Sequence, residues 1–68
     1  MIRAYATTFD EHGDALLENA PLTEPPGRIE SDEESLVVSS VELGAGVWKH
    51  TYRDRSSGTL HYMTVRPA

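Results

Sequence analysis

Cysteine is absent from this sequence, which excludes disulfide bridges, thiolate metal sites and thiol nucleophiles. Long apolar runs are absent too: the longest, such as Leu36-Val37-Val38, hold two or three residues. A membrane-spanning helix requires about 20 apolar residues, and a signal peptide requires an apolar stretch of about 7–15. We therefore expect no membrane insertion and a cytoplasmic location.

Large apolar side chains are scarce. Leu, Ile, Val and Phe together account for 14 of the 68 residues, close to the level below which a chain cannot bury a core. This length allows one small domain, residues 1–68, whose packing alone provides about 3–5 kcal/mol of stability. Chains of this kind often associate, so we expect a homodimer.

Catalytic motifs are missing as well. The sequence has no Gly-x-Ser-x-Gly elbow, no Gly-x-Gly-x-x-Gly fingerprint and no Walker A motif. Gly44-Ala45-Gly46 is a glycine turn without the phosphate-binding elements that would have to follow it, and Glu33-Glu34 lies in a segment of loop composition. We therefore expect a protein that is not an enzyme and has no cofactor.

Residues 21–34 form an acidic, proline-containing connection inside the domain. They hold three of the four prolines and five of the acidic residues. Pro25-Pro26-Gly27 cannot lie inside a helix or a central strand. This connection separates an N-terminal unit of 20 residues from a C-terminal unit of 34.

The C-terminal unit predicts a β-hairpin, because residues 47–53 and 59–66 are rich in β-branched and aromatic residues and flank a polar turn. A four-residue loop over residues 55–58 places Gly58 where a left-handed backbone is favoured and Asp54 opposite Thr59. In this register three pairs share an apolar face, on which Trp48 is expected to anchor the core: Tyr52 with His61, His50 with Met63, and Trp48 with Val65.

Two other segments are ambiguous. Residues 35–43 contain three Val and three Ser, which favours a strand, but Ser31-Asp32-Glu33-Glu34 is also a helix-capping box. Residues 2–9 suggest a strand, and residues 9–14 resemble the turn of YD-type hairpin repeats, which implies a hairpin. A helix over residues 10–20 is the alternative there. The expected fold is mainly β, an antiparallel meander of four to five strands, or α+β with one short helix at about 10–20 or 32–43.

Charge is distributed unevenly along the chain. Residues 1–45 contain ten Asp or Glu and two Arg, a net charge of −8, whereas residues 46–68 contain four Lys or Arg and one Asp, a net charge of +3. The simpler interpretation is internal neutralisation, with the basic end folded beside the acidic end. The alternative is that the charges form interaction surfaces.

Two of the three histidines are candidate metal ligands. The hairpin places His50 and His61 diagonally on one face beside Tyr52 and Asp54, and imidazole is the commonest metal ligand. Trp48, Met63 and Val65 share that face, however, which favours histidines packed among apolar side chains. We therefore predict no metal site.

Two surfaces remain as candidates for binding. The acidic one, Glu30, Asp32, Glu33 and Glu34, could meet a basic protein, as would an inhibitor or regulator of phage or mobile-element type acting on a nucleic-acid-handling protein. This is our leading hypothesis, because the chain is small and acidic and has neither cysteine nor a catalytic motif. The alternative is a nucleic-acid-binding β-module whose hairpin carries Lys49, Arg53, Tyr62 and Arg66, and a third hypothesis is a structural subunit of an assembly.

Overall fold

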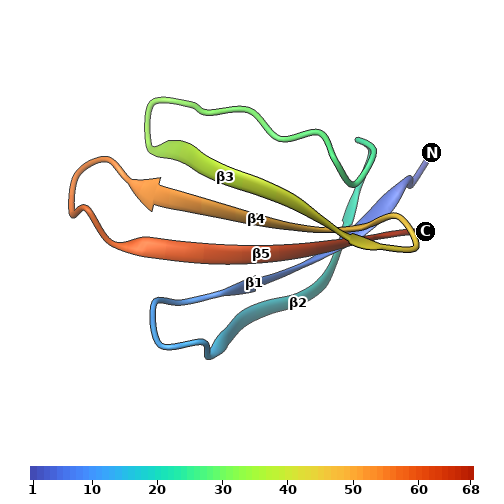
Figure 1. The fold of residues 1–68 in the computed structure, drawn as a ribbon, viewed down its shortest axis with the longest axis horizontal. Helices are drawn as coiled ribbons and strands as arrows, with labels where there is room; N and C mark the ends of the chain where they lie inside the picture. The colour runs from blue at the N-terminus through green and yellow to red at the C-terminus, as the bar shows by residue number, and fades with distance from the viewer.

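The computed structural model describes residues 1–68, and its five strands form one antiparallel sheet without any helix (Figure 1). The strands are β1 (Ala4–Phe9), β2 (Ala15–Leu22), β3 (Ser35–Gly44), β4 (Val47–Asp54) and β5 (Leu60–Pro67), in the spatial order β2-β1-β5-β4-β3. The mainly-β expectation is confirmed. With no helix in the fold, there is none that could span a membrane.

Both helix alternatives are wrong. Residues 10–20 form a turn followed by β2, and residues 32–43 form the end of the connection and most of β3. The capping-box residues act in another way, because Asp32 Oδ1 accepts hydrogen bonds from the backbone N–H groups of Glu34 and Ser35, at 2.8 Å each. The Val and Ser residues that follow pair with β4, where β-branched side chains are well tolerated.

The β4–β5 hairpin has the register that its turn chemistry predicts. Trp48 lies opposite Val65, and the other two predicted pairs, His50 with Met63 and Tyr52 with His61, are also present. Asp54 donates its N–H to the Thr59 carbonyl at 2.8 Å, and Gly58 has a φ of +76°. The four-residue loop and its left-handed glycine are therefore confirmed.

Pairing between β1 and β5 joins the two units of the chain. In this register Ala6 lies opposite Val65 and Phe9 lies opposite Tyr62. Because side chains alternate between the faces of a strand, Ala4 and Ala6 join Val65 on the core face, where all three are buried. Leu22 and Met63 pack against this cluster. The apolar core is therefore small.

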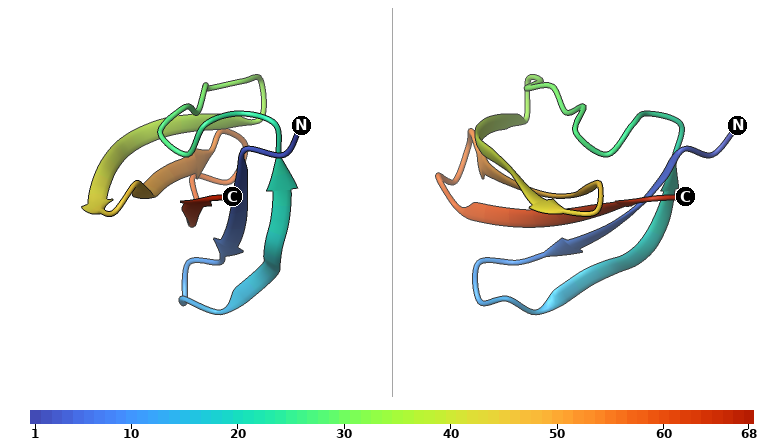
Figure 2. Two further views of the ribbon diagram at one scale, coloured as in Figure 1. Left: turned by 90° about the vertical axis from the view of Figure 1, so that its right-hand side faces the viewer. Right: turned by 45° about the vertical axis from the view of Figure 1, so that its right-hand side comes forward.

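The connection covers the core face of the curled sheet, as Figure 2 shows for the segment between β2 and β3. A Cβ atom at Gly27 would lie 2.9 Å from Cε2 of Trp48, so the backbone passes the indole where no side chain fits. Trp48 pairs with Val65 as expected but is only half-buried, and the fully buried ring on this face is His50. The two rings are stacked, with centroids 6.0 Å apart.

His50 connects three segments through its two ring nitrogens. Nε2 lies 2.7 Å from the carbonyl oxygen of Pro26 in the connection, and Nδ1 lies 2.8 Å from Oγ of Ser40 in β3. A carbonyl can only accept, so Nε2 carries the hydrogen; in the neutral ring Nδ1 then accepts from the Ser40 hydroxyl. The buried ring is thereby fully hydrogen-bonded.

Replacing this ring by an apolar one tests its contribution to stability. We expect His50→Phe to lower the free energy of unfolding by about 1–3 kcal/mol, because the Pro26 carbonyl loses its donor near a buried site. Chemical denaturation followed by Trp48 fluorescence measures the change. The matched control is His61→Phe, at a half-buried ring that stacks on Tyr52 and forms no side-chain hydrogen bond. Equal losses in the two variants would contradict the assigned role of His50.

The outer strands β2 and β3 leave both edges of the sheet open. Register shifts interrupt the pairing of each outer strand with its neighbour. In β3 the Val37 N–H donates to Ser31 Oγ at 2.9 Å. Such irregularities restrain edge-to-edge association. Exposed apolar side chains nevertheless remain on these strands: Leu16, Leu17, Leu36, Val38, Val41 and Leu43.

Homodimer formation remains a prediction, and β3 provides its test. If two copies associate through this edge, light scattering gives the mass of two chains and the substitution Val41→Lys restores the mass of one, because a charge opposes strand pairing. Lys at Thr23, an exposed residue outside the strands, is the control and should leave the mass unchanged. A single-chain mass for the unaltered protein at high concentration would remove the prediction.

Candidate functional site

The face of the sheet opposite the core is basic and aromatic. Alternate residues of β1, β4 and β5 project from it, and we call their side chains the basic aromatic face: Tyr5, Thr7, Phe9, Lys49, Thr51, Arg53, Leu60, Tyr62, Thr64 and Arg66. The three cations are exposed, the three aromatic rings are half-buried, and no member of the set is acidic. All four residues predicted for nucleic-acid binding are brought together here.

Two of the cations lie over aromatic rings. Lys49 Nζ is 5.1 Å from the ring centroid of Tyr62, and Arg66 Cζ is 4.7 Å from that of Tyr5. An exposed cation–π contact is worth about 0.5–1 kcal/mol, whereas stacking of a nucleic-acid base on an aromatic side chain is worth about 1–3 kcal/mol. A planar ligand can therefore take the place of either cation on its ring.

A depression lies within this face. It is lined by Phe9, Gly13, Lys49, Tyr62 and Thr64, and its lining is mostly apolar. Phe9 and Tyr62 are direct neighbours across the β1–β5 pairing. The depression therefore combines two adjacent rings with the side chains of Lys49 and Thr64 in a lining that is almost entirely apolar.

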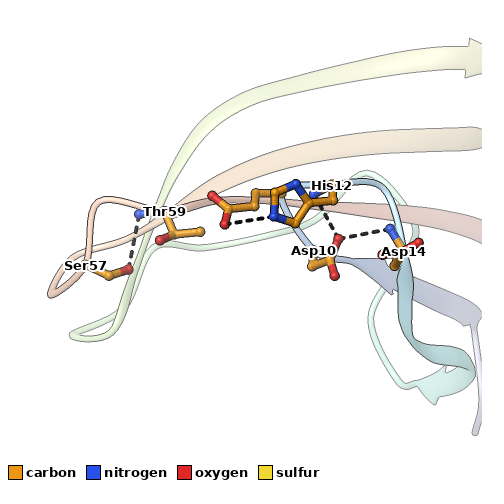
Figure 3. Close-up of polar contacts among 6 residues, drawn as sticks. Asp10, His12, Asp14, Ser57 and Thr59 are labelled. Carbon is orange, nitrogen blue, oxygen red and sulfur yellow. Dashed lines mark hydrogen bonds and ion pairs between the residues drawn. The ribbon is translucent and has the colours of Figure 1, made fainter.

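The β1–β2 turn positions Gly13 at this depression. Asp10 Oδ1 accepts hydrogen bonds from the backbone N–H groups of His12 and Asp14, at 2.9 Å each (Figure 3). The bond from Asp14 is the main reason that the pKa of Asp10 lies below its ordinary value. Gly13 itself has a φ of +85°, a conformation that glycine adopts without steric cost.

The basic end of the chain forms no ion pair with the acidic end. The two ion pairs of the structure, His12–Glu11 and Arg28–Glu24, are local, and each spans 3.4 Å. Arg55 instead donates from Nε to the Asp32 carbonyl oxygen, at 2.8 Å. Part of the basic end therefore lies beside the acidic connection, as internal neutralisation predicts, but Lys49, Arg53 and Arg66 form no ion pair.

The predicted acidic residues do not form one cluster and serve different purposes. The carboxylate of Asp32 accepts the backbone hydrogen bonds that begin β3. Glu30 lines one depression with Glu24, Arg28 and Ile29, whereas Glu33 and Glu34 line another with Asp54 and Ser56. Their connection packs on the core face, on the opposite side of the sheet from the basic aromatic face.

The histidines behave as packed side chains. Both ring nitrogens of His50 are occupied by Ser40 and Pro26, and His61 stacks on Tyr52 with centroids 5.5 Å apart. Desolvation by burial raises the pKa of the Tyr52 hydroxyl. The sequence correctly indicated that these rings share one face, but nothing in it identified Pro26 as a hydrogen-bond partner.

Asp54 builds the β4–β5 loop. Its Oδ1 accepts from the Ser56 hydroxyl at 2.7 Å and from the backbone N–H groups of Ser56 and Ser57, at 2.8 and 3.0 Å. The Ser56 hydroxyl is the largest influence in lowering the pKa of Asp54 to about 2. This carboxylate is therefore structural, like that of Asp32.

The sequence interpretation missed Tyr5, Phe9 and Gly13. The alternation within residues 4–9 could have shown that Tyr5 and Phe9 share one side of a strand. Nothing local indicated that this strand pairs with β5, because the two lie more than 50 residues apart.

Comparison of the chain with protein-family models, curated proteins and solved structures finds no match. Any function must therefore be inferred from the residues themselves.

The lowered pKa of Asp54 predicts how the stability of the protein depends on pH. A lowered pKa in the folded state stabilises the protein above the unfolded pKa, and this stabilisation is lost as the pH falls through the folded value. At neutral pH Asp54→Ala should melt at a lower temperature than the unaltered protein, and the difference should shrink between pH 3.8 and about 2. Thermal denaturation followed by circular dichroism measures it. Asp14→Ala, at an exposed carboxylate that accepts no hydrogen bond, should show no such shrinking difference.

Proposed function

We propose that this protein is a non-enzymatic binding protein that binds nucleic acid through its basic aromatic face. The proposal is supported by one observation: three exposed cations without ion pairs lie among three aromatic rings, on a face whose β1, β4 and β5 positions carry no acid. Cations can contact phosphates while rings stack on bases, which is how β-surfaces bind nucleic acid.

The net charge of −5 does not oppose this proposal. Five of the acids belong to the connection, whose Pro26 and Gly27 pack on the other side of the sheet. The protein would therefore approach a polyanion with one side only, and its acidic side would face the solvent. We expect modest affinity that falls steeply with salt.

A second candidate is the acidic surface that the sequence favoured. Glu33 and Glu34 share a depression with Asp54, which offers neighbouring carboxylates to a basic protein, such as a nucleic-acid-handling protein inhibited or regulated in the manner of phage or mobile-element proteins. Asp32 contributes less, because its carboxylate is engaged in the backbone turn. For either candidate we propose a cytoplasmic location.

Removing the cations tests the nucleic-acid proposal. A variant carrying Lys49→Gln, Arg53→Gln and Arg66→Gln should bind a labelled oligonucleotide more weakly at every sequence tested. Its slope of log affinity against log salt should fall by about 2, because each phosphate contact on a single strand contributes about 0.7. Fluorescence anisotropy over a salt series measures both quantities. All three side chains are exposed, so the variant should fold.

The matched control neutralises acids instead of cations. Glu30→Gln, Glu33→Gln and Glu34→Gln together leave the structural Asp32 intact and should strengthen oligonucleotide binding slightly by removing repulsion. Failure of the unaltered protein to bind any oligonucleotide at low salt would overturn the proposal. Loss of association with a basic protein in the acid variant alone would instead support the second candidate.

A further inference from the structure

We infer that the depression on the basic aromatic face receives one unstacked base, so that the nucleic acid bound is single-stranded. This inference rests on the proposed function. It adds that the nucleic acid is single-stranded and that one of its bases binds in the depression. The depression is lined by residues from β1, the β1–β2 turn, β4 and β5: Phe9, Gly13, Lys49, Tyr62 and Thr64.

The lining matches the chemistry of a base. Phe9 and Tyr62 lie opposite each other and provide adjacent aromatic surface, and Lys49 and Thr64 complete a lining whose surface is almost entirely apolar. Tyr62 already holds a cation over its ring, which marks that ring as accessible from the solvent side. Bases inside a duplex are stacked on one another and cannot present a face to such rings, whereas bases of a single strand can.

The cations lie on both sides of this seat along the strands. Arg53 pairs with Leu60, one alternate position beyond Tyr62, whereas Lys49 pairs with Thr64 and Arg66 follows on the other side. Same-face neighbours on a strand are about 7 Å apart, so the three cations span about 20 Å. A backbone running along β4 and β5 would thus meet positive charge before and after the seated base. This charge complementarity favours a nucleic acid strand over an uncharged apolar ligand.

The β1–β2 turn leaves the seat accessible. Apart from Gly13 and its two chain neighbours, no residue has an atom within 4 Å of the position that a Cβ of Gly13 would occupy, so the space beside this turn residue is open. The turn is fixed by the hydrogen bonds that Asp10 accepts. The depression is therefore bordered by an ordered turn and does not need to open before a base enters.

The test compares two substitutions at one ring. Tyr62→Leu removes the aromatic surface, whereas Tyr62→Phe retains it and removes only the hydroxyl. With a labelled oligothymidylate of about 12 nucleotides as the probe, we expect Tyr62→Leu to weaken binding about tenfold and Tyr62→Phe to bind like the unaltered protein. A duplex of the same length should bind the unaltered protein more weakly and should not distinguish the two variants.

A second variant and a second probe keep the test decisive if Tyr62→Leu does not fold. Phe9→Leu removes the neighbouring ring from another strand and should also weaken single-strand binding. On the ligand side, an oligonucleotide whose bases are replaced by abasic sites should bind the unaltered protein about tenfold more weakly than the intact one. Circular dichroism establishes that each variant is folded before its binding is compared.

The outcomes separate this inference from the proposed function. If duplex and single strand bind equally and the aromatic variants change nothing, while the triple cation variant still weakens binding, the face contacts phosphates alone and the inference is overturned. If the unaltered protein binds neither probe at low salt, the proposed function fails, and the inference with it. Selective loss of single-strand binding in both Tyr62→Leu and Phe9→Leu would support the inference.

Discussion

The hydrogen bonds of His50 are the constraint on which this fold depends. The ring is fully buried, and a buried polar ring without partners would cost more than it contributes. Ser40 and Pro26 provide both partners, so burial of the ring requires that β3 and the connection lie where they do. One side chain of β4 thereby couples a neighbouring strand to a segment that contains no regular secondary structure.

That coupling compensates for a thin apolar core. Ala4, Ala6 and Val65 are the only buried hydrophobic residues, and two of them contribute a single methyl group each. Burial of so little apolar area gives little stability. The hydrogen-bonded His50 ring and the Trp48 ring stacked on it contribute stability that further apolar side chains would otherwise provide. The connection therefore packs on the core face. The described residues include no segment that covers the other face, where the cations are exposed and the rings are half-buried.

Local chemistry made the hairpin predictable and left the remaining pairing undetermined. The β4–β5 register followed from Gly58, from Asp54 and from alternation, all within about 20 residues. The segments at 10–20 and 32–43 were ambiguous because a capping residue such as Asp32 can accept backbone hydrogen bonds at the start of a β-strand as well as at the start of a helix. The β1–β5 pairing is non-local, and it alone brings Tyr5 and Phe9 beside the predicted cations. The three cations and Tyr62 were therefore visible in the sequence, whereas Tyr5 and Phe9 required the fold.

Separation of the charges by the sheet explains how an acidic chain can present a basic surface. Strand alternation directs Lys49, Arg53 and Arg66 to one face, and the bond from His50 to Pro26 holds the acidic connection on the other. The molecule measures 32 × 23 × 21 Å, whereas the Debye length at physiological ionic strength is about 8 Å. Acids that lie more than one Debye length from the contact are largely screened from a polyanion on the basic aromatic face, while the cations at that contact are not. In the proposed complex the affinity is governed by the charge of one face, and the net charge of −5 mainly sets the orientation of approach.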